Sequence, residues 1–71
     1  MTTASSAIRL MARRFAVDGY IDLGDRIGQL IDDLPEERWP LRSADQAVII
    51  AILLREFPSY TLYILAVMKE C

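Results

Sequence analysis

The fold depends on one stretch of the sequence, Ala47-Val48-Ile49-Ile50-Ala51-Ile52-Leu53-Leu54, in which eight apolar residues follow one another without a polar break. The stretch lies in a chain of only 71 residues, and a second apolar run, Leu62 to Met68, follows shortly after it. A helix that is apolar on every side must be buried on every side, and so short a chain has little material with which to surround it. The sequence therefore predicts that some apolar surface is shared with a partner.

Helical spacing and stop signals divide the chain into four expected helices. Apolar residues recur every three or four positions in the first half of the chain, which is typical of amphipathic helices. Gly19, Pro35 and Pro58 stand where helices are expected to have ended, and Ser43 opens a capping-box pattern. Residues 60–64 also have the composition of a strand, but a lone strand would need a pairing partner, so a helix is favoured. We expect helices over about residues 3 or 4 to 17, 22–34, 43–56 and 59–69, with one helical turn in the connector between the second and the third.

These elements predict a single all-α domain over residues 1–71, a compact bundle of three to four short helices. The helix over 43–56 is expected at its centre, with the helices over 22–34 and 59–69 packed on it. The expected core comprises Ile27, Leu30, Ile31, Val48, Ile49, Ile52, Leu53, Ile64 and Leu65. Because 54% of the residues are hydrophobic and a small globule cannot hide them all, we expect homodimerisation to complete the bundle. The predicted dimer interface comprises Ile52, Tyr60, Tyr63 and Val67.

Composition argues against several classes of chemistry. The sequence has no His and a single Cys, Cys71, so we expect no metal site, no cofactor and no intramolecular disulfide. The usual catalytic triads need a His, and the carboxylate pairs Asp32-Asp33 and Glu36-Glu37 would need a cleft that separates their pKa values. We therefore expect no enzymatic activity. The free thiol, and the arginines that interrupt the first apolar stretch, predict a cytoplasmic protein without a secretory signal.

The charge of the chain is unevenly distributed. The formal net charge is −2, yet residues 18–37 hold seven acids against Arg26 alone, a local net charge of −6. This segment is either a solvated face that keeps the protein soluble or a recognition surface for a basic site on another protein. Trp39 either seals the corner between the second and third helices or anchors an interface. The candidate partner-binding residues are Asp25, Asp32, Asp33, Glu36, Glu37 and Trp39.

Other classes of function compete with protein binding. Ser59-Tyr60-Thr61-Leu62-Tyr63 looks like the start of the recognition helix of a helix-turn-helix DNA binder, but the apolar residues after it lack the Arg, Asn or Gln that read bases. The net negative charge also argues against a nucleic-acid partner. A membrane-active peptide would use the apolar C-terminal half, but the helices expected over 43–56 and 59–69 have only Arg55 and Lys69 as basic residues. The first 17 residues have the composition of an organelle transit peptide, although their loss would leave too little chain for a core.

The sequence therefore favours a non-enzymatic protein–protein interaction module, a small regulator or inhibitor that binds a host protein. In size, in its lack of catalytic groups and in its acidic patch, the chain is similar to the small accessory inhibitors of phages and mobile elements, such as anti-CRISPR and anti-activator proteins. The similarity is one of type and covers no motif, so it assigns no residue a role. It implies a host protein with a basic binding site as the partner, in addition to a second copy of the chain.

Overall fold

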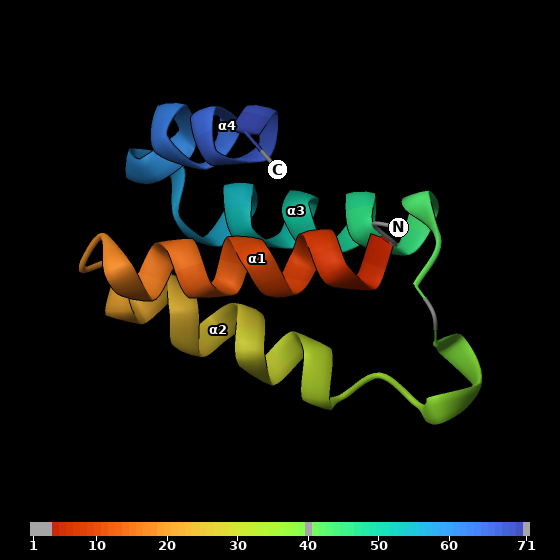
Figure 1. Cartoon of the computed structure of the whole chain (residues 1–71). Helices are drawn as coiled ribbons and strands as arrows, with labels where there is room; N and C mark the ends of the chain where they lie inside the picture. The colour runs from red at the N-terminus through yellow and green to blue at the C-terminus, as the bar shows by residue number, and fades with distance from the viewer. Residues whose placement is uncertain (1–3, 40, 71) are drawn as a thin grey trace.

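The computed structural model describes residues 4–39 and 41–70, and every regular element within them is helical. The four α-helices are α1 (Ala4–Val17), α2 (Ile21–Asp32), α3 (Ser43–Glu56) and α4 (Thr61–Glu70), and the 3-10 helices are η1 (Glu36–Arg38) and η2 (Pro58–Tyr60). Figure 1 shows α1 lying along α3, with α2 on one side of this pair and α4 on the other. The predicted all-α fold is confirmed, and the residues that could have formed a strand are helical. Of the two expected starts of the first helix, Ala4 agrees with the structure, whereas Thr3 and the thiol of Cys71 lie outside the described residues.

The turn between α1 and α2 follows from one glycine. Gly19 has a φ of 87°, a left-handed conformation that glycine adopts without a steric penalty. The amide of Gly19 donates to the carbonyl of Ala16 at 3.2 Å, and the amide of Tyr20 donates to the carbonyl of Phe15 at 2.8 Å. This is the hydrogen-bond pattern of a Schellman motif, and it reverses the chain so that α2 packs against α1.

The two ends of α3 were predicted with different success. Pro58 follows the end of the helix at Glu56, as expected. At the start, the N-cap is Arg42, and the Asp45 carboxylate accepts a hydrogen bond from the Arg42 amide at 3.3 Å. The expected capping box, with Ser43 as the N-cap and Gln46 as its partner, is therefore wrong by one residue. A carboxylate in the first turn also interacts favourably with the helix dipole, which favours Asp45 over the neutral Gln46.

The core is organised around α1, and the predicted central place of the helix over 43–56 is wrong. α1 contacts each of the other three α-helices, and α4 packs on α1. Ile8, Met11 and Phe15 of α1 are fully buried. They fall on one side of the helix, opposite its arginines, so α1 offers a single apolar face to all its neighbours.

Most of the expected core residues are confirmed as buried or half-buried, and these are Ile27, Leu30, Ile31, Ile49, Ile52, Leu53 and Ile64. Val48 and Leu65, in contrast, are 57% and 44% exposed, so their predicted core positions are wrong within a single chain. Only one side of α3 and one side of α4 meet the rest of the bundle, and these two residues lie on the opposite sides.

Candidate partner-binding surfaces

The predicted acidic patch lies along α2 and the 3-10 helix that follows it. Asp25 and Asp32 are seven residues apart, which is about two helical turns, so they project from the same side of α2. Asp33 stands at the C-terminal end of this helix, and Glu36 and Glu37 begin η1. All five side chains are exposed. We call Asp25, Asp32, Asp33, Glu36 and Glu37 the acidic edge.

The other acids of the chain have partners within the molecule. Glu56, for example, accepts two hydrogen bonds from the guanidinium of Arg26, at 2.7 and 2.9 Å. The carboxylates with such partners belong to Asp18, Asp22, Asp45, Glu56 and Glu70. In the described part of the chain, no hydrogen bond or ion pair reaches a side-chain carboxylate of the acidic edge. The acids thus divide into five that stabilise the fold and five that are left to the solvent or to a partner.

Trp39 lies next to the acidic edge and is half-buried against the core. The guanidinium carbon of Arg9 stands 4.9 Å from the centre of its ring, a distance at which a cation is attracted to an aromatic face. The placement agrees with a Trp that seals the corner between α2 and α3. Its remaining exposed surface borders a pocket, so Trp39 also stays a candidate anchor for a partner.

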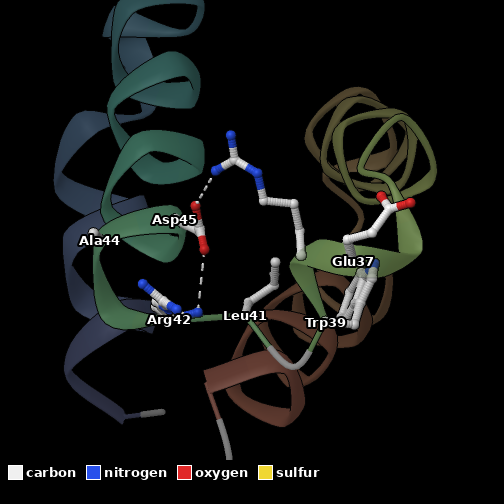
Figure 2. Close-up of a pocket in the computed structure, with 7 residues that line it drawn as sticks. Glu37, Trp39, Leu41, Arg42, Ala44 and Asp45 are labelled. Carbon is white, nitrogen blue, oxygen red and sulfur yellow. Dashed lines mark hydrogen bonds and ion pairs between the residues drawn. The ribbon is translucent and has the colours of Figure 1, made fainter.

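The pocket beside Trp39 has a volume of about 800 Å³ and lies between η1 and the start of α3 (Figure 2). Leu41 points into it, and an ion pair between Arg38 and Asp45, with N and O 2.9 Å apart, spans it. Arg42 and Glu37 complete the charged lining. Two acids and two arginines balance one another, and none of these lining residues is an activated nucleophile or a base held against one. The pocket therefore offers shape and hydrogen bonding to a ligand, without a recognisable catalytic arrangement.

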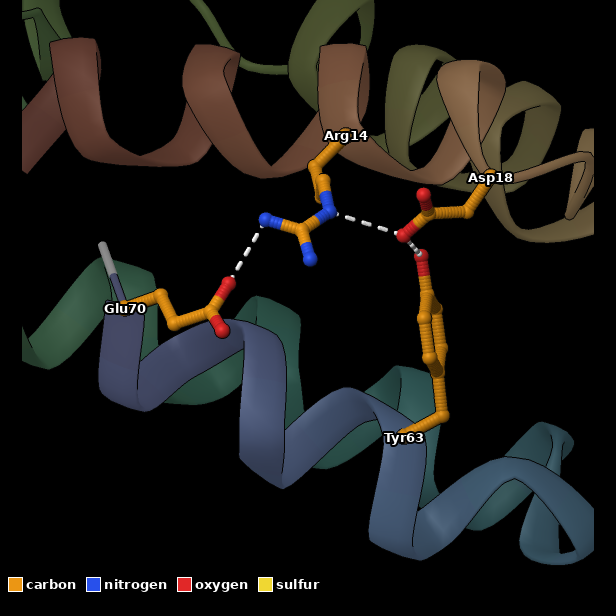
Figure 3. A network of polar contacts seen from close by, with 4 residues as sticks. All are labelled: Arg14, Asp18, Tyr63 and Glu70. Atoms are coloured by element: carbon orange, nitrogen blue, oxygen red, sulfur yellow. Dashed lines mark hydrogen bonds and ion pairs between the residues drawn. The ribbon is translucent and has the colours of Figure 1, made fainter.

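A polar network holds α4 against α1 (Figure 3). The guanidinium of Arg14 donates to Asp18 at 2.8 Å and to Glu70 at 2.6 Å, and the hydroxyl of Tyr63 donates to Asp18 at 2.6 Å. The hydrogen bond from Tyr63, followed by the one from Arg14, lowers the pKa of Asp18. Burial, followed by the hydrogen bond to Asp18, raises the pKa of the Tyr63 hydroxyl. These groups fix the position of the last helix.

The four residues predicted at a dimer interface take different places in the chain. Ile52 is half-buried on α3, and Val67 is only 2% exposed. Tyr60 donates a hydrogen bond to Asp22 at 3.1 Å, while the ring of Tyr63 stacks on that of Tyr20 with their centres 3.9 Å apart. The two tyrosines thus join η2 and α4 to the α1–α2 corner, and Val67 has almost no surface left for a partner. Their role at an interface stays a prediction.

Larger apolar surface is exposed beside these residues. Leu62, Leu65 and Met68 of α4 are 84%, 44% and 39% exposed, and Val48 of α3 is 57% exposed. We call Leu62, Leu65 and Met68, together with Ala47 and Ile50 on the side of α3 that borders Met68, the α3–α4 apolar face, whereas Val48 lies on another side of α3. Sequence reasoning missed Leu62 and Met68, although their spacing with Leu65, three residues apart each time, places the three in a row along one helix. Leu10, Val17 and Ile21 are exposed elsewhere, near α1 and the start of α2.

Three further findings bear on function. Among the described residues, no group of three or more His, Cys, Asp or Glu side chains is arranged to hold a metal ion. No single helix within 4–39 and 41–70 has both the length and the apolar character to cross a membrane, whereas α3 and Pro58–Glu70 would have them together, with a bend of 110° between them. Comparisons of the chain with protein families, curated proteins and solved structures gave no match.

Proposed function

We propose that the protein is a non-enzymatic interaction module, a small regulator or inhibitor that binds a basic site of a host protein with its acidic edge. The observation that carries this proposal is the division of the acids described above. Half of them are held by arginines, tyrosines or backbone amides, whereas the members of the acidic edge are exposed and are grouped on α2 and η1. A fold that uses its other carboxylates internally, and collects the rest on one side, has the charge distribution of a recognition surface.

The acidic edge would act first on the rate of encounter. Exposed charges of one sign steer an oppositely charged partner and suppress association with like-charged surfaces. Charges at the rim of an interface contribute little to affinity by themselves, so a tight complex also needs a buried anchor. Trp39, which stands next to Glu37 at the border of the pocket, is the residue suited to that role. Binding of this kind should weaken as the salt concentration rises.

The cellular setting is part of the proposal. A small acidic binder without catalytic groups fits the type of accessory inhibitor that phages and mobile elements produce, and it would act in the cytoplasm. The exposed apolar residues of α3 and α4 support the further expectation that the module is a homodimer, in which each copy presents its own acidic edge.

The acidic edge can be tested by neutralising it without adding bulk. A tagged variant with Asp32→Asn, Asp33→Asn, Glu36→Gln and Glu37→Gln would be compared with the natural chain in a pull-down from nuclease-treated host lysate. A charge-matched control adds four positive charges on exposed positions away from the edge, as Leu10→Lys, Val17→Lys, Ala51→Lys and Ser59→Lys. We expect one host protein to be retained by the natural chain and by the control, and to be lost from the neutralised variant. Equal retention by all three would remove the acidic edge from the mechanism.

A helix-turn-helix DNA binder is the second candidate, because one observation favours it. The bend of 110° between α3 and Pro58–Glu70 lies within the range of about 90–120° that this motif uses. Against it, the outer side of α4 presents Leu62 and Leu65 where base-reading side chains would stand. Fluorescence anisotropy with labelled duplex DNA at low and high salt separates the candidates. Binding with a steep salt dependence would support the DNA binder, and no binding at low salt would eliminate it.

A further inference from the structure

The α3–α4 apolar face has a regular form along α4. Leu62, Leu65 and Met68 are spaced three residues apart, so they form one row along the helix. Among the residues whose burial is described, Leu62 is the most exposed large apolar one, at 84%, and it stands in the first turn of α4. Met68 stands near the other end of the helix. The distance along the axis between these two positions is about 9 Å, at 1.5 Å per residue.

A hollow lies at the Met68 end of this row. It has a volume of about 250 Å³, and it is formed between the first turns of α3 and the last turns of α4. Ala47 and Ile50 of α3, together with Met68, give it an apolar wall, and Ser43 and Gln46 provide its polar end. One end of the row therefore carries a protruding leucine, and the other end carries a depression.

We propose that a second copy of this chain occupies the face, related to the first by a two-fold axis that passes near Leu65. In this arrangement the two α4 helices cross in antiparallel fashion, and Leu65 of one copy meets Leu65 of the other. Leu62 of each copy then enters the hollow beside Met68 of its partner, because Leu62 and Met68 are equally far from Leu65 along the helix. A two-fold interface requires this reciprocity: if Leu62 of one copy contacts Met68 of the other, Met68 of the first copy must contact Leu62 of the second. The inference rests on the homodimer that forms part of the proposed function, and it assigns the interface.

The charge distribution favours this pairing over others. α2 and η1, which carry the acidic edge, lie on the side of the α1–α3 pair that is opposite to α4 (Figure 1). Two copies that meet through α4 keep their acidic edges at the far ends of the dimer, whereas contacts through α2 would bring like charges together. Lys69, on the outward side of α4, can lay its carbon chain over the apolar face while its ammonium group reaches water.

The face by itself is smaller than a weak but specific interface needs, so the dimer is expected to be weak. α3 has 14 residues, so it is about 21 Å long, and two packed helices are about 20 Å wide, which gives a footprint of roughly 400 Å². A weak but specific interface buries about 600 Å² on each copy, an eighth of the 4871 Å² that one chain exposes. The helix flanks beside the footprint can supply the difference. We therefore expect dissociation in the micromolar range rather than the nanomolar range.

The oligomeric state provides the first test. Sedimentation equilibrium would be measured from about 1 to 300 µM, a range that brackets a micromolar dissociation constant, for the natural chain, Leu65→Glu and Val17→Glu. Val17 is 76% exposed on α1, outside the proposed interface, and so is the matched control. We expect the natural chain and Val17→Glu to dimerise and Leu65→Glu to stay monomeric, with circular dichroism unchanged in all three. A monomeric natural chain, or a dimer that survives Leu65→Glu, would overturn the inference.

Cysteine cross-linking provides a second test, which addresses the position of the axis. In a Cys71→Ser background, Leu65→Cys should form an intermolecular disulfide under mild oxidation, because the two sulfurs face each other, while Val17→Cys should not. Equal cross-linking of both variants would exclude the proposed axis.

Co-sedimentation with anionic vesicles, measured for the natural chain and for Leu65→Glu, completes the comparison. If the natural chain is monomeric and binds vesicles but Leu65→Glu does not, a lipid surface occupies the face instead. None of these results affects the pull-down with the acidic edge, so the two proposals fail separately.

Discussion

Ile64 and Leu62 stand two residues apart on α4, and truncation to alanine should have opposite consequences at the two positions. Ile64 is fully buried in the core, whereas Leu62 is 84% exposed. Removing a buried Leu or Ile side chain typically costs about 2–5 kcal/mol, because transfer energy is lost and a cavity remains. For Ile64→Ala we expect the free energy of unfolding to fall by about 3 kcal/mol, and for Leu62→Ala by less than about 0.5 kcal/mol.

The expected loss of unfolding free energy for Ile64→Ala is large for a chain of this length. A domain of 71 residues has a total stability of roughly 4–11 kcal/mol, so Ile64→Ala removes a quarter or more of it. In a domain of this size, each kcal/mol shifts the melting temperature by about 4–8 °C, so the expected shift is roughly 12–24 °C.

Urea unfolding followed by circular dichroism at 222 nm measures both variants against the natural chain. The protein concentration should be near 1 µM, below the micromolar dissociation expected for the dimer, so that Leu62 does not contribute through self-association. A loss of less than about 1 kcal/mol for Ile64→Ala, outside the range for a buried side chain, would show that α4 does not bury this side. Equal losses of unfolding free energy for the two variants would mean that α4 has no preferred orientation on α1. The row formed by Leu62, Leu65 and Met68 would then not be a defined surface.

Glycine and pH predictions complete the set. Gly28→Ala should raise the free energy of unfolding by about 0.5–1 kcal/mol in the same urea assay, since an added Cβ meets no atom within 4 Å. Gly19→Ala should lower the free energy of unfolding by about 1–2 kcal/mol, since φ there is 87°. The opposite order would contradict the backbone described at these two positions. Hydrogen bonds from Tyr63 and Arg26 lower the pKa values of Asp18 and Glu56, respectively. A carboxyl group whose pKa is lowered in the folded state stabilises the protein at pH values above its unfolded-state pKa. Melting temperatures should therefore fall as the pH drops below the usual pKa values of 3.8 and 4.5. Asp18→Asn should make this fall in melting temperature smaller. Burial raises the pKa of Tyr63 above 10. The stability gained from the protonated hydroxyl is present below pH 10 and is lost as the pH rises through the folded-state pKa. Tyr63→Phe should therefore make the alkaline fall in melting temperature less steep, and an unchanged slope would argue against the buried hydroxyl.

The helices could be predicted because their signals are local. Gly19, Pro35 and Pro58 mark ends that depend on backbone geometry alone, and the structure ends α1, α2 and α3 within a few residues of them. The arrangement of the helices was harder to predict. An apolar stretch that is uniform on every side, as in residues 47–54, contains no periodicity to say which side faces the core. Val48 was therefore assigned to the core, although α3 turns Ile49, Ile50 and Leu53 inward instead.

The candidate surfaces show the same division between local and distant information. The acidic edge could be found from the sequence because its members are neighbours in the chain. The partners of the other acids could not be predicted from the sequence, because Arg14 binds Glu70 across 56 positions and Arg26 binds Glu56 across 30. Tyr60 of η2 and Tyr63 of α4 are predicted at an interface for the same reason. Their partners, Asp18 and Asp22, lie in the first third of the chain and are brought to α4 only by the fold.

The network that joins α4 to α1 also sets the order in which the chain can acquire its structure. α1 and α2 are joined by only three residues, so this hairpin closes at a small entropic cost and can form while the rest of the chain is still being synthesised. α4 is made after α1, α2 and α3, yet it binds the C-terminal end of α1, through the bonds of Arg14 to Glu70 and of Tyr63 to Asp18. Phe15 of α1 and Ile64 of α4 share one core, so this part of the core forms only after the chain has been extended through α4. A ribosome that stalls before α4 therefore leaves α1, α2 and α3 with an apolar side that α4 would otherwise cover.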